Sequence, residues 1–148
     1  NAPGQVVIAG ESTAVEAAIV LCKEAGAKRA VPLDVSGPFH SPLMAPAAEE
    51  FSAALEATIV KVPDIAVIQN VDARTATDVQ EIRDKLVAQL SAPVRWTETI
   101  EALLGQGIEQ FIEAGPGNVL SGLIKRIARG TPAIPLSASD GLAEATAL

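Results

Sequence analysis

The single histidine of the chain, His40, lies in the stretch SGPFHSPLM at residues 36–44, between two prolines and two serines. An imidazole titrates near neutral pH, so a histidine on a loop just before a helix can act as a general base or acid. A base needs a nucleophile, and Ser36 and Ser41 carry the nearest hydroxyls. They are weak candidates, because the partners of a catalytic histidine usually come from separate elements. Ser41 is expected to cap the following helix, and His40 is either catalytic or a histidine without a chemical role.

A second candidate nucleophile is Ser12, in the stretch GESTA at residues 10–14. An apolar run, a short turn and a helix imitate the nucleophile elbow, in which a serine hydroxyl is held above a sheet. The imitation is imperfect, because Ala14 stands where that motif has its second glycine. Ser12 or Thr13 as a helix cap explains the same residues equally well. A self-contained serine hydrolase that uses Ser12 and His40 therefore stays open as an alternative.

Three further features have competing explanations. The Gly115-Pro116-Gly117 stretch precedes a helix and could offer N–H groups to a phosphate, but it lacks the Lys-Ser/Thr of a P-loop, which favours a tight turn. Cys22 falls on the apolar side of a predicted helix, where a packed and inert thiol is expected. Lys125, Arg126 and Arg129 cluster late in their helix, either as complements to its C-terminus or as a docking patch for an acidic partner.

The elements that must position these residues follow from hydrophobic periodicity and from Gly and Pro punctuation. Pro46 lies one turn inside the second predicted helix, so its start should be kinked or delayed. Residues 141–148 are read as a short helix or a frayed end. The alternation of strands and helices favours an α/β fold with largely parallel pairing. Strands are predicted at residues 5–9, 30–35, 65–71, 111–112 and 133–136, and helices at 12–25, 42–57, 79–90, 96–104 and 118–129.

Composition excludes several classes of protein. The 148 residues are 49% hydrophobic, which suits a folded domain with a core. A net charge of −7 argues against nucleic-acid binding, and no apolar run is long enough to cross a membrane. One cysteine allows no internal disulfide and suits the cytoplasm. No ligand spacing of a metal site is present, so no metal or cofactor is expected. The chain opens NAPG without a methionine and looks like a piece of something longer.

Several stretches, read together, resemble the C-terminal part of malonyl-CoA:acyl carrier protein transacylases, the acyltransferase family of fatty acid and polyketide synthesis. The resemblance covers nearly the whole chain. A histidine followed at this distance by Gln-Leu, by Pro-Val-x-Trp and by the Gly-Pro-Gly turn is more specific than any single motif. The matching stretches are NAPGQVVIAG (1–10), VSGPFHSPLM (35–44), QNVDA (69–73), VAQLSAPVRW (87–96) and EAGPGNVLSGLIKRI (113–127).

The resemblance implies a ping-pong acyl transfer in which an active-site serine takes malonyl from CoA and the phosphopantetheine thiol of acyl carrier protein takes it from the serine. It implies that His40 is the base, held by the main-chain carbonyl of Gln89 where other triads use a carboxylate. Asn1 and Asn70 match polar residues of the pocket. Phe39 matches a position associated with choosing malonyl over branched acyl groups.

The resemblance also implies what the chain lacks. The family's serine elbow and its carboxylate-binding arginine have no match in these residues, so both are expected upstream of Asn1. The implied fold is the C-terminal part of an α/β-hydrolase-like large subdomain, residues 36–148, after the tail of a ferredoxin-like small subdomain, residues 1–35. Expected partners are malonyl-CoA, acyl carrier protein and the N-terminal half of the same enzyme. The fragment alone is expected to be inactive, and a non-catalytic module that binds the carrier through Lys125, Arg126 and Arg129 is a further alternative.

Overall fold

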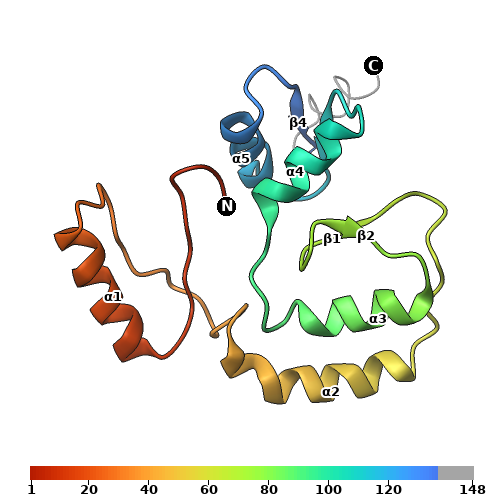
Figure 1. The fold of residues 1–148 in the computed structure, drawn as a ribbon, viewed down its shortest axis with the longest axis horizontal. Helices are drawn as coiled ribbons and strands as arrows, with labels where there is room; N and C mark the ends of the chain where they lie inside the picture. Colours follow the sequence, from red (N-terminus) through yellow and green to blue (C-terminus); the bar gives the residue numbers. More distant parts are fainter. Residues whose placement is uncertain (137–148) are drawn as a thin grey trace. The chain divides into compact units, whose positions relative to one another are not determined.

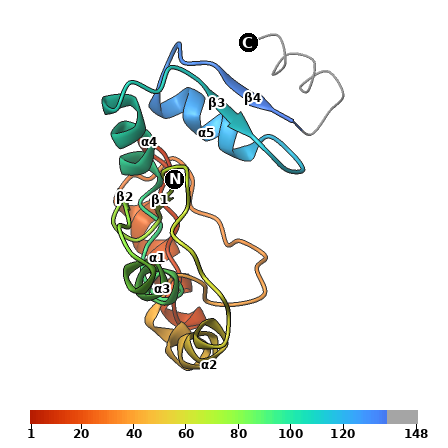
Figure 2. The ribbon, with the colours of Figure 1, turned by 90° about the vertical axis from the view of Figure 1, so that its right-hand side faces the viewer.

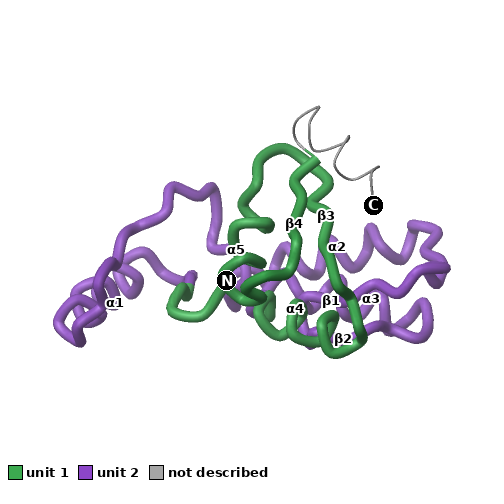
Figure 3. The backbone as a smooth tube through the Cα atoms, turned by 90° about the horizontal axis from the view of Figure 1, so that it is seen from above, with its two compact units in different colours: residues 1–6, 95–148 green, residues 7–94 purple. Residues whose placement is uncertain are grey.

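The computed structural model describes residues 1–136 of the 148-residue chain. It contains two compact units, residues 1–6 with 95–148 and residues 7–94, which Figure 3 colours separately. The predicted helix or frayed end at residues 141–148 lies outside the described residues. The elements, shown in Figure 1, are α1 (Ser12–Glu24), the 3₁₀ turn η1 (Pro42–Met44), α2 (Ala45–Glu56), β1 (Ile68–Gln69), β2 (Arg74–Thr75), α3 (Val79–Ala88), α4 (Trp96–Gly105), β3 (Phe111–Glu113), α5 (Val119–Ile127) and β4 (Ala133–Pro135).

In the unit of residues 7–94, α2 and α3 pack side by side (Figure 1). Leu55 of α2 and Ile82 of α3 are its buried helical side chains. The predicted delay at Pro46 is confirmed: a single 3₁₀ turn comes first, and Pro46 then occupies the first turn of α2, where a missing N–H costs nothing. At the start of α3, the Asp78 carboxylate accepts a hydrogen bond from the Glu81 N–H at 2.8 Å and so caps the helix.

The strands of this unit are shorter than predicted. Of residues 65–71 only β1 forms, and it pairs with β2 in an antiparallel hairpin that the periodicity did not predict. The turn at residues 70–73 closes the hairpin, with Ala73 at a left-handed φ of 56°. A strand of two residues is too short to show an alternation of apolar and polar side chains. Whether it forms depends on the segment that pairs with it.

The other unit contains a parallel pair of strands. β3 and β4 run side by side with α5 as the crossover between them, and Figure 2 shows α5 against both strands. The expected parallel pairing therefore holds for β3 and β4, whereas β1 and β2 are antiparallel. One apolar cluster holds the unit together. It consists of the buried residues Ile100, Ile124, Ala128 and Ala133 and, packed against them, Trp96, Leu104, Phe111 and Ile127.

Two predicted strands are wrong. Residues 6–9 and 30–35 carry no ladder, and Val6, Leu33 and Val35 are 83%, 58% and 62% exposed. Their apolar patterns are those of strands, but a strand forms only when a neighbour takes its N–H and C=O groups, and residues 1–136 supply none. The expectation of a packed Cys22 is also wrong, because α1 buries none of its side chains and the thiol is exposed.

The predicted helices agree with the observed ones to within a few residues at each end. α1 ends at the Gly26 that the sequence marks as its stop: the Gly26 N–H donates to the Lys23 carbonyl, the Ala27 N–H donates to the Cys22 carbonyl, and Gly26 has a φ of 91°. Within residues 1–136, no helix combines the length and the apolar character that a bilayer crossing requires.

Candidate active site

His40 sits on a tightly folded loop between two prolines. Its main chain has a left-handed φ of 61°, which is uncommon for a residue with a β-carbon. The loop is held by Ser41, which is 2% exposed and donates its hydroxyl proton to the Pro38 carbonyl at 2.7 Å. Ser41 occupies the N-cap position of η1 as predicted, but its side chain makes no capping hydrogen bond. Its hydroxyl is instead committed to the loop.

Three main-chain carbonyls at the end of α3 accept hydrogen bonds from His40. The His40 N–H donates to the Leu90 carbonyl at 3.0 Å, and ring atom Nδ1 lies 2.9 Å from the Gln89 oxygen and 3.2 Å from the Ala92 oxygen. Both ring contacts are acceptors, so Nδ1 must carry the proton. The neutral imidazole then has its lone pair on Nε2, which is the form that a general base requires.

The second ring nitrogen, Nε2, differs from Nδ1 in its surroundings. Nδ1 faces the free carbonyl oxygens of Gln89 and Ala92 at the C-terminal end of a helix. The residue is exposed, and Nε2 makes no hydrogen bond within residues 1–136. The ring is therefore anchored at one nitrogen and free at the other.

The structure joins three of the residues that the resemblance assigned to the site. His40 bonds to the main chain of Gln89, and the Gln89 side chain accepts a hydrogen bond from Asn70 Nδ2 at 3.2 Å. Phe39 is 46% exposed, and a Cβ added to Gly37 would lie 3.4 Å from its ring. Asn1 is exposed and belongs to the other unit.

Ser12 does not have the capping role predicted for it. It is the first residue of α1, Glu11 occupies the cap position, and no side chain caps the helix. Neither Ser12 nor Thr13 is therefore a cap. The elbow also needs a strand before the serine, and residues 6–9 form none. Within residues 1–136, no hydrogen bond joins Ser12 to His40.

The Gly115-Pro116-Gly117 stretch forms a turn, as the sequence favoured, and the helix end behind it is already occupied. Glu113, the last residue of β3, accepts hydrogen bonds from the N–H groups of Leu120 and Ser121 at 3.0 and 2.8 Å and from the Ser121 hydroxyl at 2.7 Å. The Ser121 hydroxyl, followed by these N–H groups, lowers the pKa of the Glu113 carboxyl. A carboxylate of the chain itself thus fills the position that a phosphate would take.

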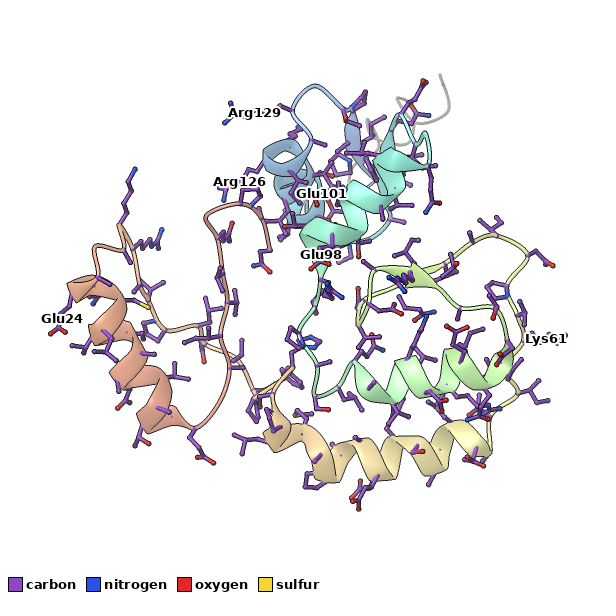
Figure 4. The ribbon with its side chains drawn as sticks, in the orientation of Figure 1. Glu24, Lys61, Glu98, Glu101, Arg126 and Arg129 are labelled. Carbon is purple, nitrogen blue, oxygen red and sulfur yellow. The ribbon has the colours of Figure 1, made fainter. Side chains whose placement is uncertain are left out.

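The basic residues Lys125, Arg126 and Arg129 are all exposed. Lys125 and Arg126 lie in the last turn of α5, where the helix terminus favours positive charge. Arg129 follows just after the helix, and Figure 4 labels Arg126 and Arg129. Arg126 also donates a hydrogen bond to the side chain of Gln5 at 2.6 Å. Within residues 1–136, no group of His, Cys, Asp or Glu is arranged to hold a metal ion.

Sequence reasoning missed several groups of the site. The Leu90 and Ala92 carbonyls are main-chain atoms, and main-chain acceptors leave no mark in residue types. The one available signal was Pro93, which ends the helical pattern and leaves the preceding carbonyls without intrahelical partners. The cap by Glu113 was also missed, because the carboxylate lies on a strand and not at the helix start, where a capping motif is sought.

The chain matches known acyltransferases over almost its whole length. The family model described as "Acyl transferase domain" matches residues 1–140. This chain belongs to the acyl transferase domain family. Among curated members, the malonyl CoA-acyl carrier protein transacylase of Bacillus subtilis is 51% identical over 93% of this chain and 43% of its own length.

Solved structures of the family have the same fold. The acyl carrier protein S-malonyltransferase of Vibrio cholerae has a TM-score of 0.88 at 48% identity, over 92% of this chain and 44% of that one. A malonyl-transacylase solved in complex with its type II polyketide acyl-carrier protein has a TM-score of 0.89 at 46% identity, over 92% of this chain and 44% of that one. This member of the family therefore spans less than half the length of its relatives.

Proposed function

We propose that this chain is the C-terminal part of a malonyl-CoA:acyl carrier protein transacylase of fatty acid biosynthesis, and that His40 is its general base. One observation carries the proposal: Nδ1 of His40 is held by the carbonyls of Gln89 and Ala92 at 2.9 and 3.2 Å, which leaves Nε2 as the basic nitrogen. The similarity to malonyl transacylases supports the choice of reaction. The enzyme is expected to work in the cytoplasm.

The reaction proceeds in two matched halves. Nε2 takes the proton of a serine hydroxyl, the serine oxygen attacks the thioester carbonyl of malonyl-CoA, and the tetrahedral oxyanion collapses to an acyl-serine as CoA leaves with the proton from Nε2. The phosphopantetheine thiol then gives its proton to Nε2 and attacks the acyl-serine. When that intermediate collapses, the proton returns to the serine oxygen, and malonyl leaves on the carrier.

The serine, the oxyanion donors and the group that binds the malonyl carboxylate are assigned to the N-terminal half of the same enzyme. The relatives support this assignment, because this chain spans 43% of the Bacillus subtilis protein. In this proposal, residues 36–148 belong to an α/β-hydrolase-like large subdomain and residues 1–35 end a ferredoxin-like small one. The unpaired apolar segments at 6–9 and 30–35 then find their ladder partners in the missing half.

The pocket and the carrier site are proposed from the same resemblance. Phe39 precedes the base, and its half-exposed ring would exclude a branched acyl group, a discrimination worth ~1–3 kcal/mol. Asn1 and Asn70 are assigned to the polar lining. The exposed residues Lys125, Arg126 and Arg129 would dock the acidic carrier protein. The relative solved with its acyl-carrier protein supports a carrier as the partner.

The test is malonyl transfer to holo carrier protein by this chain mixed with a separately produced N-terminal half. His40→Asn is the informative variant, because its amide can still donate to the Gln89 oxygen while no basic nitrogen remains. We expect the rate to fall by about 10³-fold or more. Glu24→Gln, on the exposed helix α1, is the matched control and should leave the rate unchanged. Equal rates for His40→Asn and the wild type would refute the assignment.

A further inference from the structure

We propose that Asn70 is a positioning residue: its side chain holds Gln89 so that the main-chain oxygen of Gln89 stays on Nδ1 of His40. The inference rests on the proposed role of His40 as the base. This role differs from the lining of a pocket, because Asn70 acts on the base indirectly, through Gln89. The connection consists of two hydrogen bonds, Asn70 Nδ2 to Gln89 Oε1 at 3.2 Å and His40 Nδ1 to Gln89 O at 2.9 Å.

The need for such an anchor follows from where Gln89 lies. It is the C-cap of α3, beyond which the last carbonyls have no intrahelical donors. The next residues make hydrogen bonds that span three residues instead of four. The Leu90 N–H donates to the Val87 carbonyl and the Ser91 N–H to the Ala88 carbonyl, both at 3.2 Å. Helix ends fray unless a side chain or a tertiary contact holds them. The carbonyl that orients the imidazole thus belongs to a segment that needs outside support.

Asn70 can supply that support because its own turn is rigid. It is the first residue of the turn at 70–73, in which the Ala73 N–H donates to the Gln69 carbonyl at 3.0 Å. Ala73 is 9% exposed and adopts a left-handed φ of 56°. A non-glycine residue keeps such a conformation only where its surroundings enforce it. The amide of Asn70 is therefore presented from a constrained backbone.

The turn is fastened to α3 at a second point. Lys85 Nζ lies 2.9 Å from the Asp72 carboxylate and 3.2 Å from the Thr75 carbonyl, and it also pairs with Glu81 at 2.7 Å. The Glu81 carboxylate, and then that of Asp72, raises the pKa of Lys85. Lys85 and Gln89 are four residues apart and so share one face of α3. The hairpin turn at 70–73 therefore contacts the C-terminal part of α3 at both Lys85 and Gln89.

The direct readout is the tautomer of His40, which is the only histidine of the chain. We expect ¹⁵N-labelled wild-type chain to show the imidazole with its proton on Nδ1, as the two carbonyl acceptors require. Asn70→Ala and Gln89→Ala should each shift the population towards the Nε2–H form, with the backbone amide spectrum otherwise retained. Gln80→Ala is the matched control, because Gln80 lies on the same helix and its side-chain amide donates to Asp84 at 2.9 Å.

The second readout is kinetic, with the chain mixed with its N-terminal half. Asn70→Ala and Gln89→Ala should each lower kcat by about 10–30-fold, with the KM for malonyl-CoA retained, and the double variant should be no worse than either single one. Gln89→Glu, which keeps the acceptor oxygen, should recover part of the loss.

The two readouts separate the inference from the proposed function. A tautomer unchanged in both alanine variants, or multiplicative kinetic losses, would overturn the positioning role. If the tautomer shifts as expected but His40→Asn retains full activity, the positioning of the ring stands and the assignment of His40 as the base fails.

Discussion

At the scale of single residues, His40 shows how a strained backbone is maintained. A left-handed conformation costs roughly 1–2 kcal/mol for a residue with a β-carbon. Three hydrogen bonds from His40 to the end of α3 and the internal bond of Ser41 to Pro38 offset that cost. The strain is therefore located at the residue proposed to do the chemistry, which is where strained conformations tend to cluster.

Ser41 gives the first prediction at this scale. Ser41→Ala removes the hydroxyl that donates to the Pro38 carbonyl from a site that is 2% exposed. We expect the unfolding free energy to fall by about 1 kcal/mol, because a buried acceptor loses its partner. Urea unfolding with an unchanged m-value measures the loss. Ser12→Ala is the control, since Ser12 is exposed and caps nothing, and it should leave the midpoint in place.

Glu113 gives the second prediction, a pH dependence. Its pKa is lowered from the ordinary 4.5 by the Ser121 hydroxyl and by the N–H groups of Ser121 and Leu120. A lowered pKa in the folded state means that the stabilisation is fully present above the unfolded-state pKa and is lost as the pH falls through the folded-state value. Glu113→Gln should therefore be less stable than the wild type at pH 7, and the difference should shrink towards pH 3. Denaturant unfolding at the two pH values checks this, and an equal difference at both would contradict it.

At the scale of the elements, one guanidinium links α3 to the end of α2. Arg83 of α3 donates through Nη1 to the Leu55 carbonyl and through Nη2 to the Thr58 carbonyl at 2.7 Å. These acceptors lie at the C-terminal end of α2, where free carbonyls concentrate negative charge. Helix α3 therefore binds α2 through a residue in its middle and His40 through the carbonyls at its end.

The prediction for this element is a loss of stability in Arg83→Met. The methionine keeps most of the apolar stem but removes both donors, so we expect a destabilisation of about 1–3 kcal/mol. Differential scanning calorimetry or urea unfolding measures it. Arg74→Met is the control, because Arg74 is an exposed residue of β2, and it should change stability by less than about 0.5 kcal/mol. Equal effects of the two substitutions would show that Arg83 does not hold the helix pair.

At the scale of the whole molecule, exposed apolar side chains are unusually frequent. Val6, Ile59 and Ile65 are 83%, 87% and 81% exposed, and α1 buries nothing. Large apolar surfaces on a folded protein mark interfaces or association sites. The segment at 30–35, where the exposed residues Val31, Leu33 and Val35 alternate with Pro32 and Asp34, is an unpaired strand pattern open to another chain.

The corresponding prediction concerns self-association. The wild-type chain alone should form oligomers at tens of micromolar, and Val31→Ser, Leu33→Ser and Val35→Ser together should reduce them. Sedimentation velocity measures the change. Addition of the N-terminal half should also shift the chain from oligomers to a one-to-one complex. A chain that is monomeric by itself would contradict the prediction.

The sequence by itself determined the helices and the kinship of this protein. A helix satisfies its N–H and C=O groups within its own segment, so the periodicity and punctuation that mark α2, α3, α4 and α5 were enough to place them to within a few residues. The delay at Pro46 and the stop at Gly26 are equally local. The motifs around His40 and residues 113–127 identified the acyltransferase family from residue types alone.

Only the tertiary structure decided the strands and the contacts of the site. Residues 6–9 and 30–35 have strand patterns but no neighbour among the described residues, and pairing is a property of two segments. The ring of His40 donates to a carbonyl that lies 49 residues away in the sequence, and the hydrogen bond from Asn70 to Gln89 joins residues 19 positions apart. Such bonds depend on where the end of α3 lies relative to two loops, because main-chain acceptors are the same in every residue and become specific only through their position in space.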